Sequence, residues 1–113
     1  MLDPVAGSLD QYMSLVSARQ KLVASNIANA DTPGYTTKDI DFQSEFQNAL
    51  FGSRPAVLDV QGLTMKNDGN NVNLDREARL LSENALRFSV AGNFLHSQIK
   101  SLKMAIDGGG ASA

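Results

Sequence analysis

The last third of the chain carries an uninterrupted heptad pattern of apolar and small residues. These residues recur in alternating steps of four and three, at Leu74, Ala78, Leu81, Ala85, Phe88, Gly92, Leu95, Ile99, Leu102 and Ile106. A repeat of about 3.5 residues keeps one stripe of a helix against a partner helix in a left-handed supercoil. We therefore predict a helix over 74–107. Its coiled-coil seam is formed by the large members of the pattern, Leu74, Leu81, Phe88, Leu95, Ile99, Leu102 and Ile106.

Both ends of this predicted helix carry terminal signals. Asn73 or Asp75 can supply the N-cap oxygen, and the acidic residues of the first turn suit the positive end of the helix dipole. Gly108 follows the last heptad position, where a helix commonly ends. We expect residues 108–113, which are mostly glycine and alanine, to form a flexible tail.

The N-terminal segment, residues 1–30, shows a weaker version of the same spacing. Arg19 and Asn26 interrupt its stripe, and Leu15, Leu22 and Ile27 lie off it, which indicates a second apolar face. A helix with two apolar faces has to be buried against more than one neighbour. The predicted N-terminal coiled-coil helix therefore needs a partner in addition to the C-terminal helix.

Turn-forming residues are concentrated between the two helices, over 31–73. Pro33 and Gly34 predict that the first helix stops near Ala30. A short amphipathic helix is expected over 42–51, and one or two short strands, which could pair as a β-hairpin, over 57–65. The predicted fold class is mainly α: two long terminal helices forming an antiparallel coiled coil, with a small extended or β-containing insertion between them.

Composition narrows the range of functions. The chain has 113 residues, about one domain, with a net charge of -2 and 19% charged residues. Nucleic acid is not an expected partner, because its binding depends on clustered Lys and Arg. The absence of cysteine excludes disulfides, thiolate metal sites and cysteine nucleophiles. No apolar run approaches the roughly 20 residues of a membrane span, so no direct membrane span is expected.

The chain offers few groups for catalysis. His96 is the single histidine, and it is best interpreted as a surface or interface residue. No acidic or histidine cluster has metal-ligand spacing, and no Gly-rich loop has the context of a phosphate site. Asp39 and Asp41 alternate as in an extended segment, and a solvated edge or a turn explains them better than catalysis does. We therefore expect no catalytic residue, no metal, no cofactor and no enzymatic activity.

The segment from Ala24 to Tyr35, ASNIANADTPGY, carries a helical apolar pattern directly into a polar turn. This order of residue types resembles the N-terminal signature of flagellar axial proteins. The continuation TTKDIDF, residues 36–42, and the block NNVNLDRE, residues 70–77, are most similar to the proximal members of the flagellar basal-body rod protein family. The resemblance assigns an assembly signature to Asn26, Ile27, Asn29, Asp31, Thr32, Pro33, Gly34 and Tyr35.

The resemblance implies a structural subunit of the proximal rod of the bacterial flagellar basal body, which transmits torque and lines the export channel. Implied partners are copies of the same chain, other rod proteins, the basal adaptor and the export gate. The N-terminus has no basic segment, so export to the periplasmic rod without a cleavable signal peptide is expected. In the family the terminal helices pair, which makes Asn26 and Asn29 candidates for interhelical or intersubunit hydrogen bonds.

Two alternatives stay open. Phe42 and Phe46 are spaced as one face of a short helix, and by resemblance they could also form a motif read by the export gate before folding. A helical-hairpin adaptor or export chaperone, which binds another protein through the same heptad face, is the alternative function. Such a chaperone should be a folded dimer on its own, whereas a rod subunit should be largely monomeric and loosely ordered until it assembles.

Overall fold

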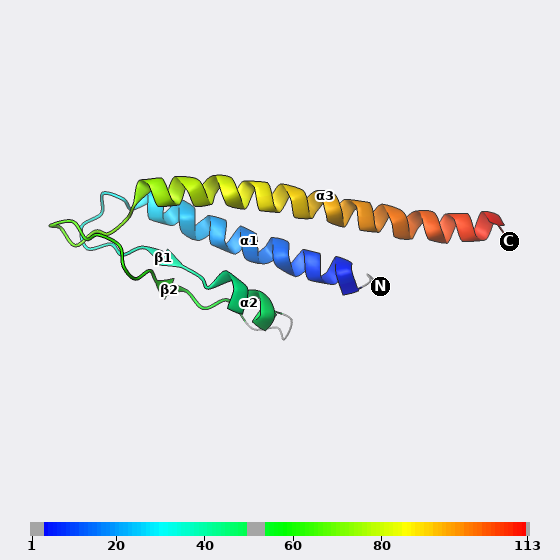
Figure 1. The fold of residues 1–113 in the computed structure, drawn as a ribbon, viewed down its shortest axis with the longest axis horizontal. Coiled ribbons are helices and arrows are strands. Elements are labelled where there is room, and N and C mark those ends of the chain that lie inside the picture. The colour runs from blue at the N-terminus through cyan, green and yellow to red at the C-terminus, as the bar shows by residue number, and fades with distance from the viewer. Residues whose placement is uncertain (1–3, 50–53, 113) are drawn as a thin grey trace.

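The computed structural model describes residues 4–49 and 54–112. Two long helices, α1 (Pro4–Ala28) and α3 (Leu74–Ser112), run antiparallel and side by side (Figure 1). Between them in sequence come strand β1 (Lys38–Asp39), helix α2 (Phe42–Ala49) and strand β2 (Leu58–Asp59). The chain is elongated, with extents of 72 × 26 × 17 Å. The predicted fold class is confirmed.

Local signals explain the limits of α1. Pro4 suits the first helical position, because its missing N–H has no intrahelical partner there. The helix ends at Ala28, two residues before the expected position. Beyond it the chain turns back through Asn29, whose amide bonds the carbonyls of Ser25 and Asn26, and Gly34 adopts a φ of 75°. A positive φ is readily adopted by glycine, so this turn depends on Gly34.

The insertion contains the expected short helix and a minimal sheet. Asp41 caps α2, because its carboxylate accepts hydrogen bonds from the Ser44 amide at 3.4 Å and the Ser44 hydroxyl at 3.1 Å. The predicted end of this helix, 50–51, lies outside the described residues. The antiparallel sheet pairs Lys38 with Asp59 and Asp39 with Leu58. Its two strands therefore flank α2, and residues 63–65, where a second strand was considered, are irregular.

Helix α3 starts where the sequence indicates and ends later. The Asn73 side chain accepts a hydrogen bond from the Arg76 amide at 3.0 Å, so Asn73 is the N-cap. The helix was expected to stop at 107, before a flexible tail over 108–113, but it continues to Ser112. Glycine lowers helix stability by about 1 kcal/mol per residue without excluding it. The described glycines with positive φ are Gly34, Gly62 and Gly69, so Gly108 does not end the helix.

The core lies mainly between α1 and α3, and much of it is polar. Val16 and Val23 of α1 are 1% exposed, and α3 contributes Ala91 together with the polar residues Glu77 and Asn84. The insertion covers another part of α1, since Tyr12 packs against Phe42 and Phe46 of α2. A neighbouring subunit is therefore not needed to bury that part of α1.

The predicted seam of α3 does not form the main contact with α1. The buried residues of α3, among those the structure describes, are Glu77, Asn84 and Ala91. Each directly precedes one of the small residues of the heptad pattern, Ala78, Ala85 and Gly92, and one residue corresponds to a rotation of about 100° around the helix. At its edge the seam meets α1 where Gly92 lies against Met13. Leu95 is half-buried, and the other large members are 37–67% exposed: Leu74, Leu81, Phe88, Ile99, Leu102 and Ile106.

Candidate functional site: a buried polar network and an exposed apolar seam

Asn26 is the centre of a buried hydrogen-bond network at the C-terminal end of α1. Its side chain is 0% exposed and makes four hydrogen bonds. The Nδ2 group donates to the Lys38 carbonyl and to Oε1 of Glu77, both at 2.8 Å. The Oδ1 atom accepts from the Tyr35 hydroxyl at 2.8 Å and from the Lys38 amide at 3.0 Å. One side chain thus joins α1, α3, β1 and the turn after α1.

A network of charged side chains adjoins Asn26. Both oxygens of Asp39 accept hydrogen bonds from Arg19 of α1, at 2.9 and 3.0 Å. The Arg76 guanidinium of α3 donates to the same carboxylate at 2.6 Å and to Glu77 at 2.9 Å. Two arginines and two carboxylates therefore balance in charge in a region where each side chain is at most 20% exposed. Unpaired charges in such surroundings would be costly.

Burial acts on the two carboxylates with different outcomes. Burial alone would raise the pKa of Asp39, but hydrogen bonds from Arg19, the Ile40 amide and Arg76 outweigh it and lower that pKa below its ordinary value. For Glu77 burial dominates and raises the pKa, although hydrogen bonds from Asn26 and the charge of Arg76 oppose it. Asp39 is therefore held ionised, and Glu77 carries the larger cost of charge burial.

The turn after α1 docks onto a second turn, just before α3. The Gly34 amide donates to the Asp68 carbonyl at 2.8 Å, and Gly69 has a φ of 85°. A Cβ atom on Gly69 would lie 3.3 Å from the Cα of Gly34, so the two turns are in close contact. The Asn70 side chain, 0% exposed, donates to the carbonyls of Asn29 and Thr32, both at 2.9 Å. This contact fixes the entry to α3 relative to the exit from α1.

The signature residues thus fall into two groups. Asn26, Asn29, Thr32, Gly34 and Tyr35 make hydrogen bonds within the chain. Ile27, Asp31 and Pro33 are exposed. In the single chain the signature therefore joins the two long helices to the insertion, and its exposed members remain free to contact other subunits.

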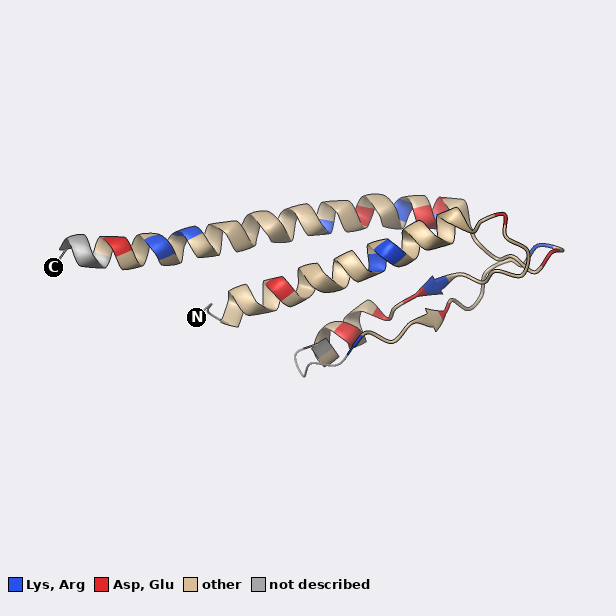
Figure 2. Ribbon diagram, turned by 180° about the vertical axis from the view of Figure 1, so that it is seen from behind, with Lys and Arg blue, Asp and Glu red and all other residues tan. Residues whose placement is uncertain are grey.

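Charged residues are unevenly distributed along α3. Figure 2 shows them gathered near the start of the helix, followed by a stretch without Lys, Arg, Asp or Glu and then a second, smaller group. The uncharged stretch, residues 88–99, includes seam residues Phe88, Leu95 and Ile99. The uncharged stretch lies in the central part of α3, whereas exposed large apolar residues occur along the helix from Leu74 to Ile106.

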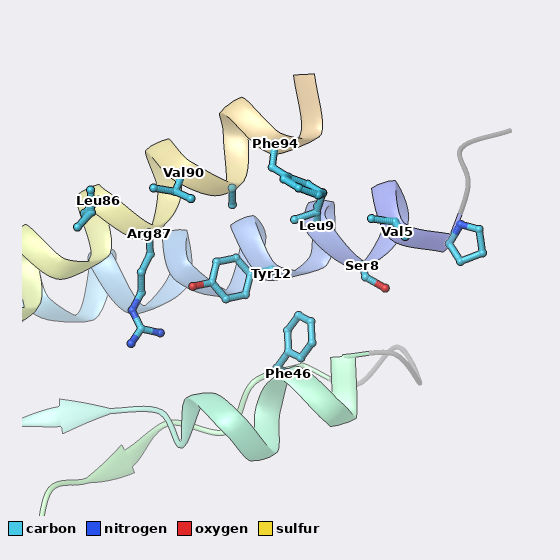
Figure 3. A pocket seen from close by; sticks show the side chains of 11 residues that line it. Val5, Ser8, Leu9, Tyr12, Phe46, Leu86, Arg87, Val90 and Phe94 are labelled. Atoms are coloured by element: carbon cyan, nitrogen blue, oxygen red, sulfur yellow. The ribbon is translucent and has the colours of Figure 1, made fainter. Parts of the chain in front are cut away.

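A second apolar surface lies between α3, the N-terminal half of α1 and α2. It is a groove of about 720 Å³, lined among others by Leu9, Tyr12, Phe46, Val90 and Phe94 (Figure 3). On its α3 side Leu86, Val90 and Phe94 are 50–65% exposed. Contiguous exposed apolar surface of this kind marks interaction sites.

The chain is similar to known flagellar rod proteins over nearly its whole length. A family model described as flagella basal body rod protein matches residues 13–36. The chain is 32% identical to the flagellar basal body rod protein FlgB of Escherichia coli, over 96% of this chain and 99% of that protein. It is 31% identical to FlgB of Salmonella typhimurium over the same shares of each chain. It is also 30% identical to FlgB of Borrelia hermsii, over 85% of this chain and 90% of that protein.

The chain belongs to the FlgB family of flagellar basal body rod proteins. The segment matched by the rod-protein model runs from the middle of α1 to the turn that follows it, and it contains Arg19, Asn26 and Gly34. These residues anchor the polar network and the paired turns described above. Within residues 4–49 and 54–112, no helix combines the length and hydropathy needed to cross a membrane.

The charged network was not recognised from the sequence of this FlgB-family chain. Asp39 and Asp41 were interpreted together as a solvated edge or a turn. That interpretation fits Asp41, which caps α2, but Asp39 is 8% exposed and bonded to two arginines. Arg19 gave a signal, because a cation interrupting an apolar stripe implies a buried anion nearby. The sequence alone did not indicate which anion, since the partner lies 20 residues away.

The candidate export motif has a structural role in the folded chain. Phe42 and Phe46 meet Tyr12 edge to face, with centroid distances of 5.3 and 5.8 Å. The Arg87 guanidinium lies 5.7 Å from the centroid of Phe42, a cation–π contact between α3 and α2. His96 is exposed on α3. In the described part of the chain no group of three or more His, Cys, Asp or Glu side chains is placed to hold a metal ion.

Proposed function

We propose that the chain is a non-catalytic structural subunit of the proximal rod of the bacterial flagellar basal body, where it transmits torque and lines part of the export channel. Membership in the FlgB family supports the rod assignment. The exposed seam of α3 is the structural observation that supports assembly with other subunits. Six large apolar residues stay 37–67% exposed along one stripe of a single helix. Such a stripe suits side-by-side packing with helices of other subunits.

The polar network supports a role in transmitting torque. Torque passes through a subunit only if its elements keep their relative positions under load. Asn26 and Asp39 join α1, α3 and the insertion through hydrogen bonds of 2.6–3.0 Å. We infer that this network stiffens the end of the subunit at which both helices meet the insertion. The proposed partners are copies of this chain, other rod proteins, the basal adaptor and the export gate.

The test separates assembly from folding. Leu81→Gln and Phe88→Gln replace seam residues that are 39% and 43% exposed. We expect each variant to unfold within about 1 kcal/mol of the parent, because surface substitutions cost little, yet to reduce the yield of rods in purified basal bodies. Met65→Gln is the matched control, since Met65 is 58% exposed but lies outside α3. Rod yields that match those of the control would overturn the role of the seam.

The adaptor or chaperone alternative uses the same seam and gives a different result in isolation. Sedimentation of the purified chain over a concentration series, with circular dichroism, distinguishes the two. A rod subunit is expected to stay monomeric and gain helicity when rod partners are added. A stable, fully helical dimer at low concentration would instead favour the chaperone.

A further inference from the structure

The segment between the long helices forms a strap along α1. We define the strap as residues 38–49 and 54–63, which comprise β1, α2, β2 and their described connections. Figure 1 shows α1 lying between the strap and α3. The strap and α3 therefore bury different faces of the same helix.

The strap has little structure of its own. Its sheet consists of two residues in each strand, and Leu58 of the outer strand is 53% exposed. Residues 54–59 are all exposed, and of these Pro55 and Val57 border a groove that α1 and Phe88 of α3 also line. Short two-stranded pairings are marginally stable in water without a packed face. The strap is therefore held in place mainly by what its inner half contacts.

Asp39 is the charged tie between the strap and both helices. Its carboxylate accepts hydrogen bonds from Arg19 of α1 and from Arg76 of α3. The other charged contact of the sheet, between Lys38 and Asp59, joins the strap to itself, and Asp59 is 54% exposed. The root of the strap has a separate anchor, because Asn71 accepts a hydrogen bond from the Thr37 amide at 2.7 Å. Asn26 of α1 also holds this root, because its side chain bonds the amide and the carbonyl of Lys38. Loss of Asp39 would thus release the strap beyond Lys38 without releasing its root.

The face of α1 beneath the strap is apolar between two strap contacts. Tyr12 touches Phe42 and Phe46, and Arg19 binds Asp39. Leu15 lies on the same face, three residues after Tyr12 and four before Arg19, and it is 2% exposed. Opening of the strap would expose Leu15 while leaving the contact between α1 and α3 intact.

We propose that the strap is a separately opening unit, closed by the Asp39 carboxylate between Arg19 and Arg76, and that it uncovers the Tyr12–Leu15 face of α1 when this tie is lost. The opening follows from the contacts within the chain and does not depend on the rod function.

Hydrogen exchange followed by mass spectrometry tests the opening on the full chain. Asp39→Asn replaces one carboxylate oxygen by an N–H₂ group that faces the arginine N–H groups. We expect amides of the strap to exchange at least about tenfold faster, and the free energy of opening in the strap to stay below that in α1 and α3. Asp59→Asn is the matched control in the neighbouring strand, and its effect should stay below about twofold. Equal free energies of opening in the strap and both helices, or no acceleration in the strap, would overturn the proposal.

Thiol labelling gives an independent measurement, because the chain has no cysteine. Leu15→Cys reports on the face beneath the strap, and Ala91→Cys, at a site 5% exposed, reports on the contact of α3 with α1. Adding Asp39→Asn should accelerate labelling at position 15 and leave position 91 protected. Labelling of both positions at equal rates would mean that the chain opens as one unit.

Discussion

Asn26 offers the most direct test of the network, because one substitution removes four hydrogen bonds at once. In Asn26→Ala, the amide and the carbonyl of Lys38 both lose their side-chain partner. Glu77 keeps its contact with Arg76 but loses the Asn26 amide donor. The half-buried Tyr35 hydroxyl can still turn toward solvent. The principal loss is therefore the pairing of two main-chain groups and one carboxylate oxygen.

The expected cost follows from these groups. A buried polar group left without a partner costs about 1–3 kcal/mol, and more if it is charged. With two main-chain groups and a weakened carboxylate, we expect Asn26→Ala to lower the free energy of unfolding by about 3–5 kcal/mol. Because 1 kcal/mol shifts the melting temperature of a small domain by about 4–8 °C, the midpoint should fall by at least about 10 °C.

Circular dichroism at 222 nm during thermal and urea unfolding measures this loss, and two variants make it specific. Asn29→Ala removes exposed hydrogen bonds to Ser25 and Thr32, so it should cost only about 0.5–1.5 kcal/mol. Asn26→Asp keeps the shape but turns a donor toward Glu77 into an acceptor, so it should destabilise the chain as much as alanine does. The reasoning is refuted if Asn26→Ala loses no more free energy of unfolding than Asn29→Ala, or if Asn26→Asp loses much less than Asn26→Ala.

Three further outcomes are expected. Gly69→Ala should cost about 1–3 kcal/mol in urea unfolding, because φ is 85° and the opposing turn is close, while Gly7→Ala, in open helix, should be neutral or stabilising. Burial raises the pKa of Glu77 above its unfolded value, so its ionised form costs stability at neutral pH, and this cost is lost as pH falls through the folded pKa. The free energy of unfolding of the parent, relative to that of Glu77→Gln, should therefore rise as the pH falls from about 7 to about 4.5. A difference between the two that does not change with pH would contradict this. Phe42→Ala and Tyr12→Ala break the same aromatic contact. If export reads Phe42, only Phe42→Ala should lower the amount of secreted protein, and an equal loss in both variants would point to the contact instead.

The long helices could be predicted from the sequence because their signals are local. The heptad pattern, with Asn73 or Asp75 as the N-cap, predicts the start of α3, and the Pro33–Gly34 turn predicts the end of α1 to within two residues. The C-terminal end of α3 could not be predicted in the same way. Glycine is compatible with a helix or a tail, and in the structure the helix continues through Gly108.

The buried charges could not be predicted, because burial depends on elements that are distant in sequence. Asp39 lies 20 residues from Arg19 and 37 from Arg76. It becomes buried only when α1, β1 and α3 meet, and no local pattern encodes that meeting. Asn26 was identified as a candidate for buried interhelical or intersubunit bonds by resemblance. Its four partners could be named only from the structure.

The seam shows the limit of periodicity as a guide. A heptad pattern identifies a stripe that favours burial, but it does not name the partner. Helix α3 turns an adjacent stripe toward α1, and that stripe contains Glu77 and Asn84. The amide atoms of the Asn84 side chain are buried without a hydrogen-bond partner within the described residues. The contact inside the chain is thus more polar than the exposed seam of α3.

This arrangement divides two tasks between two faces of one helix. Polar groups buried between helices select a particular register, at a cost in stability compared with apolar residues. The network around Asn26 can therefore set how α3 lies on α1, while Leu81 and Phe88 remain available to other chains. Apolar burial contributes about 25 cal/mol per Å² wherever it occurs. A chain that buried its seam internally would gain stability alone and lose it at the contact with its neighbours, so for an assembling subunit the exposed seam is the more useful placement.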